Sequence, residues 1–159
     1  MPELEQKTFQ KRLIAYKIRI SDIINGSFTK DELSAGYIKL NNVDISRVNV
    51  IAAIVYKAEN LNYANAMIDD STGRISLRSF ENNETFSKID VGDVVLVIGK
   101  IREFNNERYI IPEILKKNID FGWVNVRRLE LKNTVANDEP KNEEKVIEEL
   151  ATINLNEKI

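Results

Sequence analysis

One strand-like stretch combines an aromatic ring with a cation in a way that suits contact with a single-stranded nucleic acid. In residues 74–80, Ile75 and Leu77 point to one side, and Arg78 and Phe80 point to the other. An aromatic ring on the polar side of a strand is not a simple core residue. Flat rings stack on bases and cations follow phosphates, and these two devices hold single strands.

A second ring, Phe104, directly precedes Asn105-Asn106. This dipeptide predicts a turn, because asparagine tolerates the positive φ that a tight turn needs. Phe104 is therefore expected in a loop and not in a protein interior. For both rings, the alternative is that they cover the ends of the folded domain as packing.

Further cations are candidates for phosphate contacts. Lys100 and Arg102 are two residues apart in a strand-like stretch, so they share one face. Arg108 follows the predicted turn, and Lys57 is a secondary candidate. Contacts between these cations and phosphates would make binding sensitive to salt. The alternative is a solvated face, where charged side chains are common.

The composition argues against most catalytic chemistry. The chain has no cysteine and no histidine, which excludes disulfides, zinc sites built on these residues, and imidazole acid–base catalysis. Asp69-Asp70 precedes Ser71, Thr72 and Gly73, a pattern typical of a turn in which aspartate bonds its own backbone. No other acidic cluster outside the turns and the C-terminal tail supports a metal site. We expect no enzyme activity, no metal and no cofactor.

The pattern of apolar residues predicts a mainly β protein. Turn signals separate five stretches rich in valine, isoleucine and leucine, at residues 48–56, 63–68, 74–80, 94–102 and 108–115. Strands of this length and spacing favour a small all-β barrel or sandwich. Before them, Ser21 is expected to cap a short helix that Gly26 ends, and residues 37–40 and 43–45 are expected to form a hairpin around Asn41-Asn42.

After the strands, residues 121–131 are predicted to form a helix with apolar residues on most of its sides. Such a helix is expected to bury more than one side. One side can pack on the barrel and another can meet a partner. The expected interface residues are Phe121, Trp123, Val124, Leu129 and Leu131.

Charge and composition divide the chain into four parts. Residues 1–12 are a flexible lead-in, 13–118 the main domain, 119–131 the helix segment and 132–159 a flexible acidic linker or tail. Residues 1–131 hold 19 basic and 18 acidic side chains, a net charge of +1, whereas 132–159 hold 4 and 7, a net charge of -3. The polar residues 1–11 and the absence of a long apolar run predict an intracellular protein.

Four segments in series resemble the middle subunit, of the 32 kDa type, of replication protein A. They are Val43-Asp44-Ile45-Ser46-Arg47-Val48-Asn49-Val50-Ile51, Ile68-Asp69-Asp70-Ser71-Thr72-Gly73, residues 75–80, and Gly99-Lys100-Ile101-Arg102-Glu103-Phe104-Asn105-Asn106. The resemblance covers residues 16–131. It implies a five-stranded OB-fold barrel that binds single-stranded DNA through one face. Phe80 and Phe104 match the family's two stacking aromatics.

The resemblance also implies partners and a cellular role. The C-terminal helix of the family joins a bundle with a larger and a smaller subunit, and the complex acts in DNA replication, repair and recombination. The location would be the cytoplasm in an archaeon and the nucleus in a eukaryote. A winged-helix domain often follows in the family; this chain either lacks that domain or is a fragment that stops in the linker.

The sequence departs from the family pattern in its second strand, and two alternatives to a DNA-binding function stay open. Asn65 and Met67 stand where the family commonly has a bulkier or basic residue, which predicts weak binding by this chain alone. One alternative is an assembly scaffold with little DNA contact. The other is a telomere-capping subunit of the Stn1 type, which shares the architecture.

Overall fold

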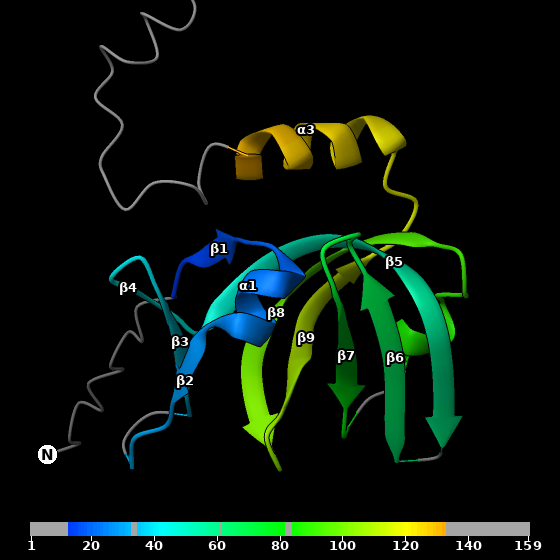
Figure 1. Ribbon diagram of the computed structural model, residues 1–159. Coiled ribbons are helices and arrows are strands. Elements are labelled where there is room, and N and C mark those ends of the chain that lie inside the picture. The colour runs from blue at the N-terminus through cyan, green and yellow to red at the C-terminus, as the bar shows by residue number, and fades with distance from the viewer. Residues whose placement is uncertain (1–12, 33–34, 61, 82–83, 133–159) are drawn as a thin grey trace, which may run out of the picture.

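A closed barrel of five strands forms the body of the protein in the computed structural model, which describes residues 13–32, 35–60, 62–81 and 84–132 (Figure 1). The strands are β5 (Arg47–Asn60), β6 (Tyr63–Asp69), β7 (Arg74–Ser79), β8 (Val94–Phe104) and β9 (Glu107–Lys116). They pair in the order β5-β6-β7-β9-β8, and β8 pairs with β5 to close the barrel. All these pairings are antiparallel except β7 with β9. The predicted all-β barrel is confirmed.

Strand alternation fills the barrel interior with branched apolar side chains. In β8, Val95, Val97 and Ile101 are fully buried, and the residues between them face outward. Gly99 takes the remaining inward position, because a Cβ there would collide with the backbone of Ile111. The pairing of β8 with β9 shifts by one residue between Ile98 and Gly99, as at a β-bulge. This close approach explains why only glycine fits.

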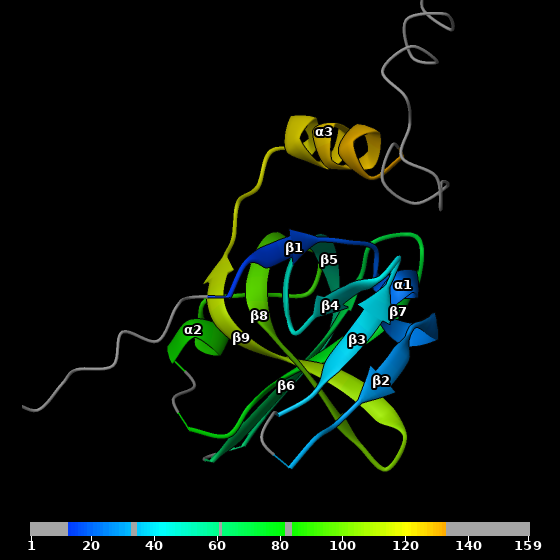
Figure 2. The same cartoon turned by 90° about the vertical axis from the view of Figure 1, so that its left-hand side faces the viewer.

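Short elements before the barrel close one of its ends. They are β1 (Ala15–Lys17), α1 (Ile20–Asn25), β2 (Ser27–Thr29), β3 (Tyr37–Leu40) and β4 (Val43–Ile45). Strand β1 runs parallel to β5, and β2, β3 and β4 form a separate antiparallel sheet (Figure 2). The expected hairpin of β3 and β4 is confirmed, with positive φ at Asn41 and Asn42.

The start of α1 differs from the expectation that Ser21 caps it. The helix begins at Ile20, and side chains of the turn between β6 and β7 accept hydrogen bonds from its first two N–H groups. The Ile20 N–H donates to the Asp70 carboxylate at 3.0 Å, and the Ser21 N–H donates to the Thr72 hydroxyl at 3.1 Å. The predicted turn therefore also caps a helix that lies about fifty residues earlier in the chain.

The same turn is locally hydrogen-bonded, as its residue types indicate. Asp69 accepts from the Ser71 N–H at 2.7 Å and from Arg74 Nε at 2.8 Å. The Ser71 bond, and then the Arg74 contact, lower the pKa of Asp69 below its usual value. Within the described residues, no group of three or more acidic side chains is arranged to hold a metal ion.

Two short elements were not predicted, namely β2 and α2 (Glu84–Ser87), which lies between β7 and β8. Helix α2 buries the Phe86 side chain in the core. Elements of three or four residues are too short to show a periodic pattern, whereas β3 and β4, which are equally short, were predicted from the Asn41-Asn42 turn between them. No helix in the described part of the chain is long and apolar enough to cross a membrane.

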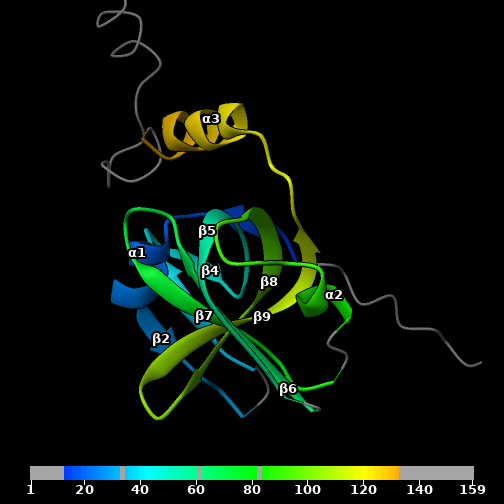
Figure 3. The same ribbon diagram turned by 90° about the vertical axis from the view of Figure 1, so that its right-hand side faces the viewer.

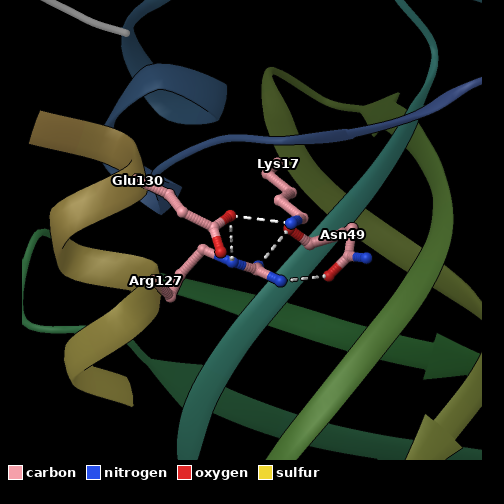
Figure 4. Close-up of polar contacts among 4 residues, drawn as sticks. All are labelled: Lys17, Asn49, Arg127 and Glu130. Atoms are coloured by element: carbon pink, nitrogen blue, oxygen red, sulfur yellow. Dashed lines mark hydrogen bonds and ion pairs between the residues drawn. The ribbon is translucent and has the colours of Figure 1, made fainter. Parts of the chain in front are cut away.

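Helix α3 (Phe121–Lys132) lies over the end of the barrel where β1 runs alongside β5 (Figures 1 and 2). Arg127 is 7% exposed and donates to both the backbone oxygen and the side-chain Oδ1 of Asn49, each at 2.8 Å. Glu130 accepts from Lys17 at 2.7 Å and lies 3.9 Å from Arg127 (Figure 4). One face of the helix is thus fixed on the barrel by polar contacts.

Two ionisable groups of this contact have altered pKa values. Burial lowers the pKa of Arg127, against the opposing attraction of Glu130. The hydrogen bond from Lys17 lowers the pKa of Glu130. At the end of the helix, Arg19 donates to the Leu131 carbonyl at 2.9 Å. Both charge and hydrogen bonding therefore hold α3 in place.

Candidate nucleic-acid interface

The candidate site lies on the outer face of β6 and β7 and at the turn between β8 and β9. In Figure 3 the β8–β9 turn lies at the lower left of the barrel, and the start of β6 lies at the lower right. Along β6, Ala64, Ala66 and Ile68 face the barrel interior. The outward residues are paired across the two strands, with Asn65 opposite Arg78 and Met67 opposite Ser76.

Three aromatic rings gather at one end of this face. The Phe80 ring lies 5.5 Å from the Tyr63 ring and 6.4 Å from the Tyr109 ring, between ring centres. We call Tyr63, Phe80 and Tyr109 the aromatic cluster. Phe80 is 53% exposed, so it does not belong to the barrel interior. Its ring is supported from the side and open to solvent, as a stacking platform requires.

The turn between β8 and β9 exposes the second ring. Phe104 ends β8 and is 65% exposed. Asn105 and Asn106 follow with φ values of 51° and 61°, the left-handed conformation that a two-residue hairpin turn requires. The expected turn is confirmed, and the structure places Phe104 at its edge with most of the ring in solvent.

A surface hollow of about 270 Å³ separates part of β7 from the β8–β9 turn. Its walls combine apolar and charged groups, which suit the bases and the phosphates of a nucleic-acid strand. The lining residues are Ile24, Met67, Arg74, Ile75, Ser76, Asn106, Glu107 and Arg108.

Arg78 is the cation at the centre of the site. Its guanidinium lies 4.5 Å from the centre of the Tyr109 ring, and its Nη2 forms an ion pair with Glu107 at 3.0 Å. The side chain is 15% exposed. Arg78 Nε and Asn65 Oδ1 are both buried and without a hydrogen-bond partner among the described residues, although the two residues are opposite each other. Buried polar atoms are rarely left unpaired.

Lys100 and Arg102 face outward from β8, as predicted. Lys100 is exposed, and Arg102 is half-buried. Arg102 is directly opposite Tyr109 in the pairing of β8 with β9. The Arg102 guanidinium donates to the Ile101 carbonyl at 2.8 Å. Lys100 is one step further along, opposite Ile111.

Arg108 and Lys57 have structural partners that the sequence did not reveal. Arg108 Nη1 donates to the carbonyls of Ile23, Ile24 and Gly26, and its Nε pairs with Glu103 at 3.0 Å. It thereby holds the end of α1. Lys57 donates to the Ile89 carbonyl at 2.7 Å. A phosphate contact from either cation would have to replace these bonds.

The predicted partner surface on α3 divides into two parts. Phe121, Trp123 and Leu129 are 74%, 61% and 64% exposed. Leu131 is 7% exposed and packs toward the barrel, and Val124 is half-buried beside a cavity under the helix. The outward apolar face also includes Val126, which the sequence pattern did not single out and which is 40% exposed.

Comparisons with known proteins agree with this architecture. Residues 48–117, from β5 through β9, match the family model described as the OB-fold nucleic acid binding domain. A 32 kDa subunit of replication protein A from Oryza sativa subsp. japonica is 25% identical over 111 residues, which are 67% of this chain and 37% of that protein. This chain is an OB-fold protein similar to the middle subunit of replication protein A. The resemblance inferred from the four segments is confirmed.

A second relative covers more of the chain. The uncharacterized protein MJ1654 of Methanocaldococcus jannaschii is 33% identical over 129 residues, which are 80% of this chain and 52% of that protein. The chain thus spans about half the length, or less, of the curated relatives that it matches.

Two solved structures share the fold. One is a chain of a replication protein A heterotrimer bound to ssDNA, with a TM-score of 0.66 and 21% identity over 77% of this chain and 95% of that chain. The other is from the S. pombe Stn1-ten1 complex, with a TM-score of 0.64 and 17% identity over 77% of this chain and 91% of that chain. At these identities the likeness shows the fold alone.

Proposed function

We propose that this OB-fold domain binds single-stranded DNA on the outer face of β6 and β7. The observation that carries the proposal is the pair of solvent-exposed rings, Phe80 and Phe104. Arg78 lies over Tyr109 of the aromatic cluster, and a hollow lies between β7 and the β8–β9 turn. OB-folds use the face of their second and third strands and the loops beside it to bind oligonucleotides. In this barrel those strands are β6 and β7.

The proposed action is binding without catalysis, inside the cell, as the middle-type subunit of a replication protein A-like complex. Such a complex would act in DNA replication, repair and recombination. The outward apolar face of α3 is the proposed contact with a larger and a smaller subunit. Exposed aromatic and aliphatic residues on one helix face favour an interface. The relationship to the 32 kDa subunit supports this role.

A second candidate is a subunit of a Stn1-type complex. The fold similarity to the S. pombe Stn1-ten1 complex is nearly as high as that to replication protein A, with TM-scores of 0.64 and 0.66. Both candidates use the same DNA-binding face and differ in their partners. A pure scaffold, the third reading, has no need of exposed rings beside a cation.

Fluorescence anisotropy with a labelled oligo-dT strand tests the DNA-binding proposal. Replacing Phe80 and Phe104 together with alanine should weaken binding by about 2 kcal/mol or more, since a stacked base contributes about 1–3 kcal/mol. Phe121→Ala is the matched control, because it also removes an exposed ring, 74% exposed, but on α3 over the other end of the barrel.

The outcomes separate the three readings. Binding to the single strand and not to a duplex, lost in the double variant and kept in the control, supports the proposal. A folded wild-type chain that does not bind at low salt would favour the scaffold. Equal losses in the double variant and the control would show that the two rings are not the binding site.

A further inference from the structure

The guanidinium of Arg78 is only partly satisfied. Its Nη2 pairs with Glu107 at 3.0 Å, while its Nε is buried and has no partner among the described residues. Nε and Nη2 lie on the same edge of the guanidinium, so Glu107 occupies only half of that edge. An arginine edge of this kind is best filled by an anion that accepts two parallel hydrogen bonds.

The position of Glu107 allows its carboxylate to move away from Arg78. Its side chain is 62% exposed, and it directly follows the turn of Asn105 and Asn106 at the start of β9. Ion pairs with an exposed partner contribute little to stability. Arg78 itself is held from below by the Tyr109 ring at 4.5 Å, so its guanidinium stays in position without the carboxylate.

We propose that Glu107 is an exchangeable counter-ion of Arg78, which a phosphate of single-stranded DNA displaces. The proposal rests on the proposed function. A phosphate group offers two oxygens to the Nε and Nη2 edge, whereas Glu107 reaches Nη2 alone. Until DNA binds, Glu107 pairs with the cation that the Tyr109 ring holds in position. Glu107 is thus a specificity-determining residue, which selects ligands that fill both positions of the edge.

The neighbouring pair of Arg108 and Glu103 provides a control within the same hairpin. It has the same 3.0 Å separation, and the two glutamates flank the same turn. Arg108, however, also donates to three backbone carbonyls at the end of α1. Because these hydrogen bonds keep the Arg108 guanidinium at the end of α1, removing the charge of Glu103 should not make Arg108 available to a phosphate.

The experiment compares the full chain with its Glu107→Gln and Glu103→Gln variants, using anisotropy of labelled oligo-dT at low salt. Glu107→Gln removes the competitor and should tighten binding about threefold to fivefold, the scale of an exposed ion pair. Glu103→Gln should change the affinity by less than about twofold. A thermal melt of each variant checks that the fold is kept.

A double-variant cycle makes the test specific for Arg78. In the Arg78→Ala background, the gain from Glu107→Gln should disappear, because the two residues act on one contact.

A gain that persists without Arg78, or an equal gain in Glu103→Gln, would overturn the exchange and indicate a general effect of charge. An unchanged affinity in Glu107→Gln would also overturn it and leave DNA binding by the wild-type chain intact. If the folded wild-type chain does not bind oligo-dT, the proposed function fails and the exchange fails with it.

Discussion

Arg78 and Arg127 are both largely buried arginines on the outside of the same barrel, yet their surroundings differ. Arg127 donates to the backbone and side-chain oxygens of Asn49 and lies near Glu130. Arg78 has one contact to an exposed carboxylate, one ring beneath it and, among the described residues, no partner for its Nε. The first guanidinium makes two hydrogen bonds to the barrel, whereas the second keeps a buried N–H without one.

This difference indicates two kinds of surface on one small domain. An arginine that donates to a neighbouring element fixes one element on another, here α3 on β5. An unsaturated arginine beside exposed rings leaves hydrogen-bonding capacity for a ligand. The surface that holds α3 and the proposed binding surface are therefore separate. The helix lies over the end of the barrel where β1 runs alongside β5, and the aromatic cluster lies on the face of β6 and β7 (Figures 1 and 3). Substitutions on the two surfaces should have opposite consequences for stability and for affinity.

The largest expected effect is on stability, from Arg127→Ala. The change leaves the Asn49 carbonyl without its donor and opens space under α3. It should lower the free energy of unfolding by about 2–3 kcal/mol, since a buried polar group left unpaired costs about 1–3 kcal/mol. Urea denaturation measures the loss, and oligo-dT affinity should stay unchanged at a protein concentration where the variant is folded.

Arg128→Ala is the matched control for this prediction. Arg128 is the next residue of α3 and is exposed, and within the described part of the chain its side-chain hydrogen bond is the 3.3 Å contact with the Ser71 hydroxyl. Its loss should change stability by less than about 0.5 kcal/mol, as is usual for surface substitutions. Equal effects of the two variants would remove the distinction between a holding arginine and an ordinary surface arginine.

The opposite pattern is expected from Arg78→Ala. Stability should change little, and binding of oligo-dT should weaken by about 1.5–3 kcal/mol, the usual scale of a hydrogen bond to a charged group. Arg78→Lys should recover only part of the loss, because an ammonium group cannot form two parallel bonds. Anisotropy measures the affinity, and a urea titration measures the stability.

Arg74→Ala serves as the comparison on the same face. Arg74 lies on the same strand as Arg78 and lines the hollow, but its side chain is 65% exposed and pairs with Asp69. Its effect on binding should be clearly smaller than that of Arg78→Ala. If Arg78→Ala instead destabilised the fold as much as Arg127→Ala and left binding unchanged, the contrast between the two arginines would be wrong.

The sequence predicted the elements of both surfaces better than it predicted the side chains that serve them. Alternation of apolar residues located all five barrel strands, and the four family segments located Phe80 and Phe104. The contacts of Arg108 could not be predicted, because they join residues that are more than eighty positions apart. For the same reason, the cap that Asp70 provides for α1 gave no local signal.

The helix shows a second limit of sequence reasoning. Its apolar residues lie on most sides, so the pattern could not say which side packs on the barrel. The direction depends on Arg127, a polar residue that finds its partners only in the folded chain. Leu131 was expected in the partner interface and packs inward, while Val126 was missed and faces outward. Tyr109 was missed because it becomes part of the aromatic cluster only through the pairing of β9 with β7.

The smallest expected effect concerns the pH dependence of the holding surface, tested with Glu130→Gln. The hydrogen bond from Lys17 lowers the pKa of Glu130 from its usual 4.5, so the folded chain favours the ionised carboxylate more than the unfolded chain does. The stability that this group contributes is therefore present above about pH 4.5 and is lost as the pH falls through the lowered pKa. Glu130→Gln lacks this contribution at every pH, and its stability should converge with that of the wild type in acid.

Urea titrations of both proteins from pH 6 to pH 3 measure the convergence. Asp69 and the other carboxylates titrate equally in the two proteins and cancel in the difference. A constant difference across this range would mean that the Lys17–Glu130 pair does not hold α3, and that Arg127 fixes the helix without it.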